Sequence, residues 1–141
     1  METMTTQQEL RLKTSESEKI TINLGPIDLG QIDLLVQEGF YANRTDLIRT
    51  AIRNQLAQHA DVVKQTVARK SLVLGMQHYT RQDLEHLQAA GERLRIHVLG
   101  LASIANDVSV ELALATIESI FVLGALHASA VLKTALAGRI H

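Results

Sequence analysis

The first clear pattern along the chain is an alternation of polar and apolar residues over residues 19–24. The alternating positions are Lys19, Ile20, Thr21, Ile22, Asn23 and Leu24. A period of two places successive side chains on opposite faces of a strand, so this segment is predicted to be a strand with one buried face. Gly25-Pro26 ends it, because proline has no N–H for a strand ladder and fixes φ for a helix start.

Two helical patterns follow this strand. Residues 27–38 carry apolar side chains at helical spacing, and Gly39 ends the pattern. Asn43 is placed to cap a second helix, whose apolar stripe occupies one face of residues 47–56. Neither glycine nor proline occurs over residues 44–70, so one long helix or two nearly collinear helices are predicted to continue through them and to connect the two halves of the chain.

The C-terminal half carries an internal repeat. Val-Leu-Gly triplets occur at residues 73–75, 98–100 and 122–124, each within an apolar run and each followed by a helical pattern. The three predicted helix caps are Thr80, Asp107 and Ser129. The repeated glycine suggests a point where the strand bends or where another backbone approaches closely.

Three strand-helix units at this spacing predict a parallel sheet, because parallel strands need a crossover connection, which is commonly a helix. A short right-handed solenoid with its helices on one side is the favoured arrangement for residues 71–141. A small open α/β sheet of the regulatory-domain type is the alternative. The Ala-, Leu- and Val-rich last unit has almost no charge, which favours an association surface there.

A strand and two short helices enclose too little core to stand alone, and a single strand has two open edges. The economical solution is an intertwined dimer in which the strands of two chains pair antiparallel above four helices. Seven apolar residues are predicted to form the dimer core: Ile20, Ile22, Leu24, Leu29, Ile32, Ile48 and Ile52.

This order of elements, with the phrases KITINL and NRTDLIRTAI, resembles the ribbon-helix-helix (CopG/MetJ/Arc-type) family of DNA-binding regulators over residues 18–56. The resemblance implies that a two-stranded ribbon lies in the major groove. The outward strand residues Lys19, Thr21 and Asn23 would then contact bases, and their donors and acceptors suit base edges. The family also binds phosphate at the start of its second helix, and the matching residues are Asn43, Arg44 and Thr45.

Composition narrows the function further. The 141 residues contain 14 Lys and Arg against 15 Asp and Glu, so a nonspecific nucleic-acid coat is disfavoured. Cysteine is absent, which excludes disulfides and thiolate chemistry. No apolar run is long enough for a membrane span, and the N-terminus has no apolar core of the kind a signal peptide carries, so no membrane partner and a cytoplasmic location are expected.

Candidate chemistry is sparse. The six histidines are scattered without a carboxylate or cysteine at ligand spacing, so no metal site and no cofactor are expected. No nucleophile motif or phosphate-binding glycine loop occurs, so no catalytic residue is assigned and an enzyme is not expected.

The predicted fold class is α+β, in which an N-terminal ribbon-helix-helix dimer is joined by a long helix to a small C-terminal module of three strand-helix repeats. The expected domains are a disordered tail at 1–17, the DNA-binding and dimerisation domain at 18–56, the connector at 57–70 and the oligomerisation module at 71–141.

The predicted function is sequence-specific DNA binding by a homo-oligomeric transcriptional regulator, most simply a repressor, with double-stranded DNA and further copies of the chain as partners. C-terminal self-association would couple dimers into a tetramer or a higher assembly. The alternatives are an antitoxin of a toxin-antitoxin pair, an architectural DNA-binding protein, and a regulator whose effector binds among the repeats.

Overall fold

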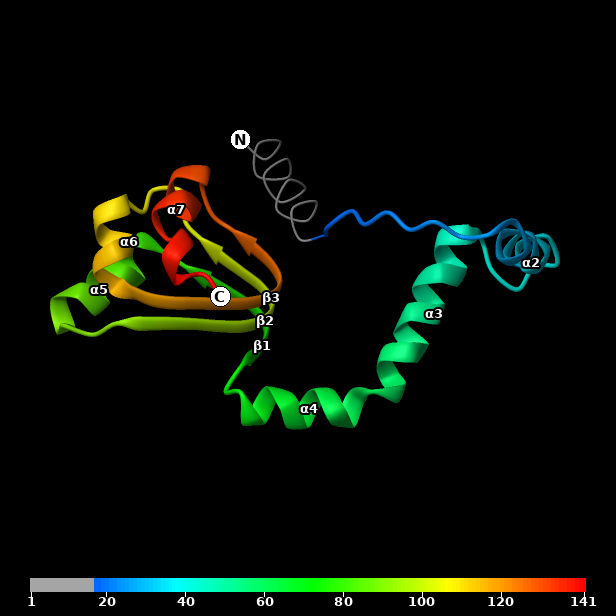
Figure 1. Ribbon diagram of the computed structural model, residues 1–141, viewed down its shortest axis with the longest axis horizontal. Helices are drawn as coiled ribbons and strands as arrows, with labels where there is room; N and C mark the ends of the chain where they lie inside the picture. The colour runs from blue at the N-terminus through cyan, green and yellow to red at the C-terminus, as the bar shows by residue number, and fades with distance from the viewer. Residues whose placement is uncertain (1–16) are drawn as a thin grey trace, which may run out of the picture. The chain divides into compact units, whose positions relative to one another are not determined.

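The computed structural model of the protein describes residues 17–141 and divides them into two compact units, residues 17–66 and residues 67–141 (Figure 1). The predicted disordered tail, residues 1–17, lies outside the described residues except for Ser17. Helices combine with a three-stranded parallel sheet, which confirms the α+β fold class.

The N-terminal unit contains the two predicted helices. Helix α2 spans Pro26–Gln37, and Pro26 stands at its start, where the missing N–H removes no helical hydrogen bond. Gly39 follows the helix with a φ of +84°, which suits a residue without a side chain. Helix α3 spans Arg44–Gln58 and begins immediately after its cap, Asn43. The local turn chemistry therefore sets the helix limits that the sequence predicts.

The predicted strand at residues 19–24 is not a strand in the single chain. Residues 17–25 lead into α2 without regular secondary structure (Figure 1). A strand is defined by hydrogen bonds to a neighbouring strand, and none of the strands among the described residues pairs with this segment. The expected neighbour is the same segment of a second chain, so the ribbon and the intertwined dimer remain a prediction.

The connector consists of two helices, the second of the two forms that the sequence left open. Helix α3 ends at Gln58 and helix α4 spans Ala60–Arg69, with His59 between them at φ −103° and ψ 11°. The N–H of His59 donates to the carbonyl of Leu56 at 3.0 Å, which closes the last turn of α3. Its own carbonyl accepts the N–H of Val63 at 3.0 Å, which opens α4. One residue therefore interrupts the helix without glycine or proline, which is why composition did not reveal the break.

The C-terminal unit is built from alternating strands and helices. In chain order its elements are β1 Val73–Tyr79, α5 Arg81–Ala90, β2 Leu94–Ile104, α6 Val110–Thr116, β3 Ile117–His127, α7 Ala130–Ala135 and the short 3₁₀ helix η1 Ala137–Arg139. The strands form one parallel sheet in the order β1-β2-β3. The predicted three-stranded parallel sheet is therefore confirmed.

The strand register aligns the three Val-Leu-Gly triplets. Val73 pairs with Val98 and then Val122, and the leucines and glycines follow in step. Sequential strand order with equivalent residues side by side is the arrangement of stacked solenoid coils, and it disfavours the open-sheet alternative.

The helices pack together on one side of the sheet and close the core (Figure 1). Twelve buried residues form this core: Leu84, Ile96, Val98, Ala102, Ile104, Val108, Leu112, Ala113, Ile117, Ile120, Leu132 and Leu136. Strand β2 contributes alternate residues because one of its faces points inward. Helices α5, α6 and α7 contribute leucines one turn after their caps, so each coil supplies one layer of the core.

Helices α5, α6 and α7 each begin at a hydroxyl cap. Thr80 caps α5 and forms a capping box with Asp83, whose carboxylate accepts the N–H of Thr80 at 2.9 Å. Ser129 caps α7 by accepting the N–H of Leu132 at 3.2 Å. The predicted cap at Asp107 is wrong, because Ser109 caps α6 two residues later. Residues 105–109 form the turn that carries the chain from β2 to this cap.

The aligned glycines mark a corner in every strand. Gly75, Gly100 and Gly124 have φ values of +127°, +137° and +120°, and Figure 1 shows β2 and β3 bending sharply partway along. A Cβ on Gly100 would lie 2.1 Å from the carbonyl oxygen of Gly75, and a Cβ on Gly124 equally close to that of Gly100. The corner therefore requires glycine both for its backbone conformation and for the stacking of successive coils.

Candidate nucleic-acid interface

The residues predicted to contact bases lie on the segment that leads into α2. Lys19, Thr21 and Asn23 are exposed, and so are the apolar residues that alternate with them. Ile20 and Ile22 are 74% and 56% exposed. A single chain therefore leaves both sides of this segment in solvent, and burial of its apolar side requires a further surface.

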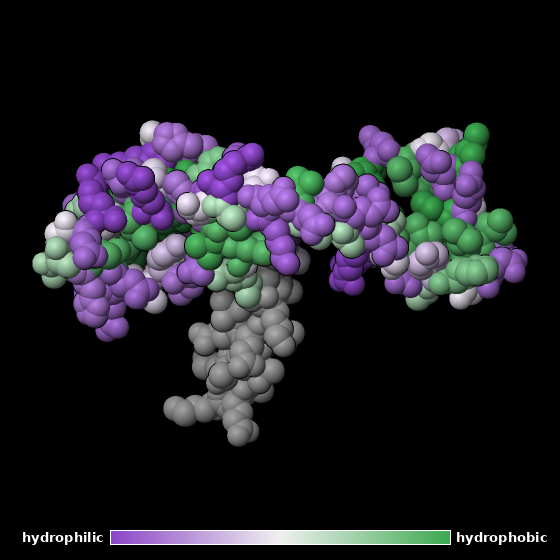
Figure 2. Space-filling model, turned by 90° about the horizontal axis from the view of Figure 1, so that it is seen from below, coloured by the Kyte–Doolittle hydropathy of each residue, from purple (hydrophilic) through white to green (hydrophobic). Residues whose placement is uncertain are grey.

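The N-terminal unit has no buried core of its own. No side chain in residues 17–66 is buried, and Ile27 and Phe40 are more than 70% exposed. Figure 2 shows hydrophobic side chains gathered over α2 and α3, at the right of the view. Continuous exposed apolar surface of this kind marks an interaction site in a soluble protein.

The predicted dimer-core residues all belong to this open apolar surface. Four are exposed and three are half-buried: Ile20, Ile22, Leu24 and Ile52, then Leu29, Ile32 and Ile48. One chain does not bring them together into a core. Their assignment to a dimer interface stays a prediction, and their exposure supports it.

The start of α3 offers unpaired backbone donors. The side-chain oxygen of Asn43 accepts the N–H of Asp46 at 2.8 Å, and the Asp46 carboxylate accepts the N–H of Ala42 at 2.9 Å. The N–H groups of Arg44 and Thr45 have no hydrogen-bond partner among residues 17–141. First-turn N–H groups and the positive end of the helix dipole attract anions, so this end of α3 suits a phosphate group.

Arg44 is paired with an acidic residue of α2. Its Nε and Nη2 atoms donate to the two carboxylate oxygens of Asp33 at 2.7 and 2.8 Å. The hydrogen bond from Arg44 is the main cause that lowers the pKa of Asp33 and, in turn, the bond to Asp33 raises the pKa of Arg44. This bidentate pair joins α2 to α3 and fixes the direction of the guanidinium.

Asp33 is the site residue that the sequence reasoning missed. The prediction treated Arg44 as a free charge for phosphate, whereas two of its nitrogens already donate to Asp33. The third nitrogen, Nη1, makes no hydrogen bond to any residue in 17–141 and remains available to an anion. The sequence shows an acidic residue in the helix before the Gly39 turn. That it faces Arg44 of the next helix can be recognised only when the positions of both helices are known.

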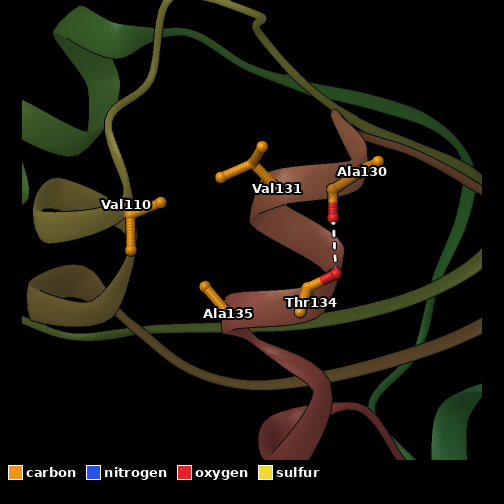
Figure 3. A pocket seen from close by; sticks show the side chains of 5 residues that line it. All are labelled: Val110, Ala130, Val131, Thr134 and Ala135. Atoms are coloured by element: carbon orange, nitrogen blue, oxygen red, sulfur yellow. Dashed lines mark hydrogen bonds between the residues drawn. The ribbon is translucent and has the colours of Figure 1, made fainter.

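An open apolar depression lies on the surface of the C-terminal unit. It encloses about 460 Å³ and lies between α6 and α7, lined by Val110, Ala130, Val131, Thr134 and Ala135 (Figure 3). The Thr134 hydroxyl is its sole polar side-chain group, and it donates to the Ala130 carbonyl at 2.9 Å. Ligand sites usually orient their ligand with convergent polar groups. This depression has none to offer.

Other site types find little support in the described part of the chain. No three His, Cys, Asp or Glu side chains in residues 17–141 gather as metal ligands. No helix within the same residues is long and apolar enough to cross a bilayer.

A pair of helices without its own core, preceded by an alternating polar and apolar segment, is the arrangement of a DNA-binding module that works as a dimer. The comparison with protein families agrees with this class. The model of the ribbon-helix-helix transcriptional regulator family matches residues 15–133. The chain belongs to that family, which confirms the resemblance seen in residues 18–56 and makes DNA binding and transcription regulation its functional class.

The family match extends well beyond the DNA-binding module and includes nearly all of the strand-helix unit. No curated protein and no solved structure matches the chain. The C-terminal unit therefore has to be interpreted from its own residues.

Proposed function

We propose that the protein is a sequence-specific transcriptional repressor that acts as a dimer on double-stranded DNA in the cytoplasm. Residues 19–24 of two chains would pair antiparallel and form a ribbon in the major groove. Lys19, Thr21 and Asn23 would face the base edges, where lysine suits guanine and asparagine suits adenine. The apolar residues between them would face the four helices beneath.

The observation that carries this proposal is the exposure of the apolar side of residues 19–24, together with apolar faces of α2 and α3 on which no side chain is buried. A unit with no buried side chain in residues 17–66 does not fold alone at ordinary stability, because too little apolar area leaves water. Pairing with an identical chain covers these surfaces by twofold symmetry. It also turns the polar side of both segments outward.

The start of α3 supports the proposal with a phosphate contact. The free N–H groups of Arg44 and Thr45 would bind one phosphate oxygen, and the Asn43 cap keeps them oriented. The Asp33 pair holds Arg44 beside this end of the helix rather than in free solution. These contacts would position the ribbon without distinguishing sequences.

The C-terminal unit would couple dimers into tetramers or larger assemblies. A tethered second dimer binds an adjacent half-site at high effective concentration, so that weak sites become occupied. This unit is folded around its own core in a single chain, which favours a regulator over an antitoxin, whose partner-binding segment would fold on the toxin.

Fluorescence anisotropy with three variants tests the division of roles. Asn23→Ala is expected to weaken binding to the preferred site by about 1–3 kcal/mol and to relax the preference at one base pair. Arg44→Ala is expected to weaken all sequences alike and to reduce the salt dependence of binding. Arg49→Ala, which removes an exposed arginine further along α3, is the matched control and should change little.

Two results would contradict the assignment. If Asn23→Ala lowered affinity equally for all sequences, the ribbon would not carry base readout. If Arg49→Ala reduced the salt dependence as much as Arg44→Ala, the start of α3 would be no special phosphate site, and the arginines would act only through their summed charge.

A further inference from the structure

The two edges of the C-terminal sheet differ in whether other residues of the described chain cover them. The edge at β3 is covered at its start by the C-terminal residues, where Ile140 forms a parallel bridge with Ile120 and the N–H of His141 donates to the Ile120 carbonyl at 2.8 Å. Nη1 of Arg139 fixes this segment by donating to the carbonyls of Leu114 and Ile117, both at 2.7 Å.

The edge at β1 has no such cover. Strand β1 pairs only with β2, and no residue in 17–141 bonds to its outer edge. Val73, Leu74 and Met76 are 45%, 61% and 64% exposed. An uncovered strand edge presents a row of unpaired N–H and C=O groups that can pair with another strand.

The sequence of β1 lacks the features that keep edge strands apart. Residues 71–79 contain no lysine, arginine, aspartate, glutamate or proline. Natural proteins protect open edges with charges, prolines or bulges. Strand β1 has neither charges nor proline and exposes Val73, Leu74 and Met76, which is the composition expected of an edge that another strand covers.

We propose that β1 pairs antiparallel with β1 of a second copy of the chain, so that two C-terminal units join edge to edge into one continuous sheet. This inference rests on the proposed function for the presence of a second copy, and it names the surface through which the C-terminal units associate. It also moves that surface from the Ala- and Leu-rich last repeat, favoured by composition, to the first strand.

A second copy fits this edge better than another partner for three reasons. Regulators of this family dimerise, so every assembly contains the β1 edge in at least two copies. Twofold symmetry pairs an edge with itself in the antiparallel direction. Because residues 71–79 carry no charged side chain, self-pairing sets no like charges opposite each other.

The glycine corner defines the register. Strand β1 turns at Gly75, where φ is +127°, so two copies remain in contact along both arms of the strand only if their corners coincide. The twofold axis then passes at Gly75. Nothing in the described chain lies within 4 Å of the Cβ position on this glycine, which leaves room for the second backbone. Leu74 of one copy would lie opposite Met76 of the other, and the two most exposed apolar side chains of β1 would cover each other.

Single cysteines in the full-length chain test the pairing, because the natural sequence has none. Leu74→Cys, Met76→Cys and Thr21→Cys are treated with a short thiol-reactive cross-linker, and Thr21→Cys reports the N-terminal ribbon separately. Val131→Cys is the matched control, since Val131 is 65% exposed on α7 and Met76 is 64% exposed. An equimolar mixture of the Leu74→Cys and Met76→Cys chains tests the register by mild oxidation.

We expect the two β1 variants to become predominantly covalent dimers and Val131→Cys to stay monomeric on a denaturing gel. Oxidation should give more disulfide-linked dimer in the mixture than in either variant alone, because Leu74 faces Met76 across the axis.

Cross-linking of Val131→Cys in place of the β1 variants would overturn the inference. Cross-linking of Thr21→Cys alone would also overturn it, while leaving the ribbon dimer intact. If Thr21→Cys also failed to cross-link and the chain sedimented as a monomer, the proposed function itself would fail.

Hydrogen exchange gives a second measurement that does not depend on cysteine chemistry. In the full-length protein the amides of residues 71–79 should exchange slowly, because both edges of β1 are bonded. Met76→Lys should speed exchange in this segment, and Val131→Lys should leave it unchanged. Equal exchange in both variants and in the natural chain would contradict edge pairing.

Discussion

The stacking of the glycine corners makes Gly100→Ala the most informative single change in the C-terminal unit. The new Cβ would lie 2.1 Å from the carbonyl oxygen of Gly75, whereas Cβ atoms in proteins essentially never approach another heavy atom within 3.0 Å. The neighbouring atom belongs to the backbone of β1 and therefore has no side-chain rotation by which to move away.

The expected loss has two parts. A non-glycine residue held near φ +137° costs about 1–3 kcal/mol in backbone strain. Relief of the clash requires β1 to move away from β2, and each backbone hydrogen bond lost contributes about 1 kcal/mol. Loss of three of these bonds brings the sum to about 4–6 kcal/mol, which is exceptional for one substitution. For a unit of this size it lowers Tm by at least about 15 °C.

Urea and thermal denaturation of the full-length chain, followed by circular dichroism, measure this loss against two controls. Gly91→Ala changes a glycine with φ +68° that has open space around its Cβ position, so it isolates the strain of positive φ at about 1–2 kcal/mol. Gly138→Ala changes a glycine with open space and no positive φ, and should lie within about 0.5 kcal/mol of the natural chain.

The order of the stability losses among the glycine variants tests whether the coils are closely stacked. Gly100→Ala should lose clearly more stability than Gly91→Ala, and Gly124→Ala should match Gly100→Ala because its Cβ meets the Gly100 carbonyl at the same distance. If Gly100→Ala lost no more than Gly91→Ala, the coils would not be stacked as closely as the structure indicates.

Three further predictions concern single contacts. Asn43→Ala removes the cap of α3 and should lower the stability of the N-terminal unit by about 1 kcal/mol, as measured by urea unfolding. Asn43→Ser keeps a capping oxygen and should lose much less stability. Equal losses in the two variants would refute a capping role. Arg139→Met should cost about 1–3 kcal/mol, because the Ile117 carbonyl loses this donor and the Leu114 carbonyl keeps only the longer bond from Arg93 at 3.5 Å; the exposed Lys133→Met is the control in the same denaturation experiment. The lowered pKa of Asp33 means that its pair contributes stability above the ordinary carboxyl pKa of 3.8, and that this contribution is lost as pH falls through the lower folded pKa. Asp33→Asn should flatten the acid limb of the stability curve, as urea unfolding at a series of pH values would show.

Local chemistry made much of the fold predictable. Pro26, Gly39 and Asn43 fix the limits of α2 and α3 through backbone geometry and capping, which depend only on neighbouring residues. The Val-Leu-Gly triplets predicted the parallel sheet because nearly equal spacing brings equivalent residues of successive strands into register. These features need no knowledge of distant contacts.

The remaining features depend on residues far apart in the chain or on a second chain. The Asp33–Arg44 pair joins two helices across a turn, and the presence of either residue in the sequence does not by itself predict the pair. The break at His59 has no glycine or proline to signal it. The predicted strand at residues 19–24 needs a neighbour that a single chain does not supply, so its alternation is expected to give a strand only in the proposed dimer.

Selection of random duplex DNA by the full-length protein at physiological salt, followed by sequencing of the retained DNA, tests the central claim most directly. A sequence-reading dimeric ribbon predicts an enriched motif with two related half-sites, whose spacing would report how the C-terminal units join dimers. Retention without any enriched motif, lost as salt rises, would contradict base readout and leave only electrostatic contact with the phosphate backbone.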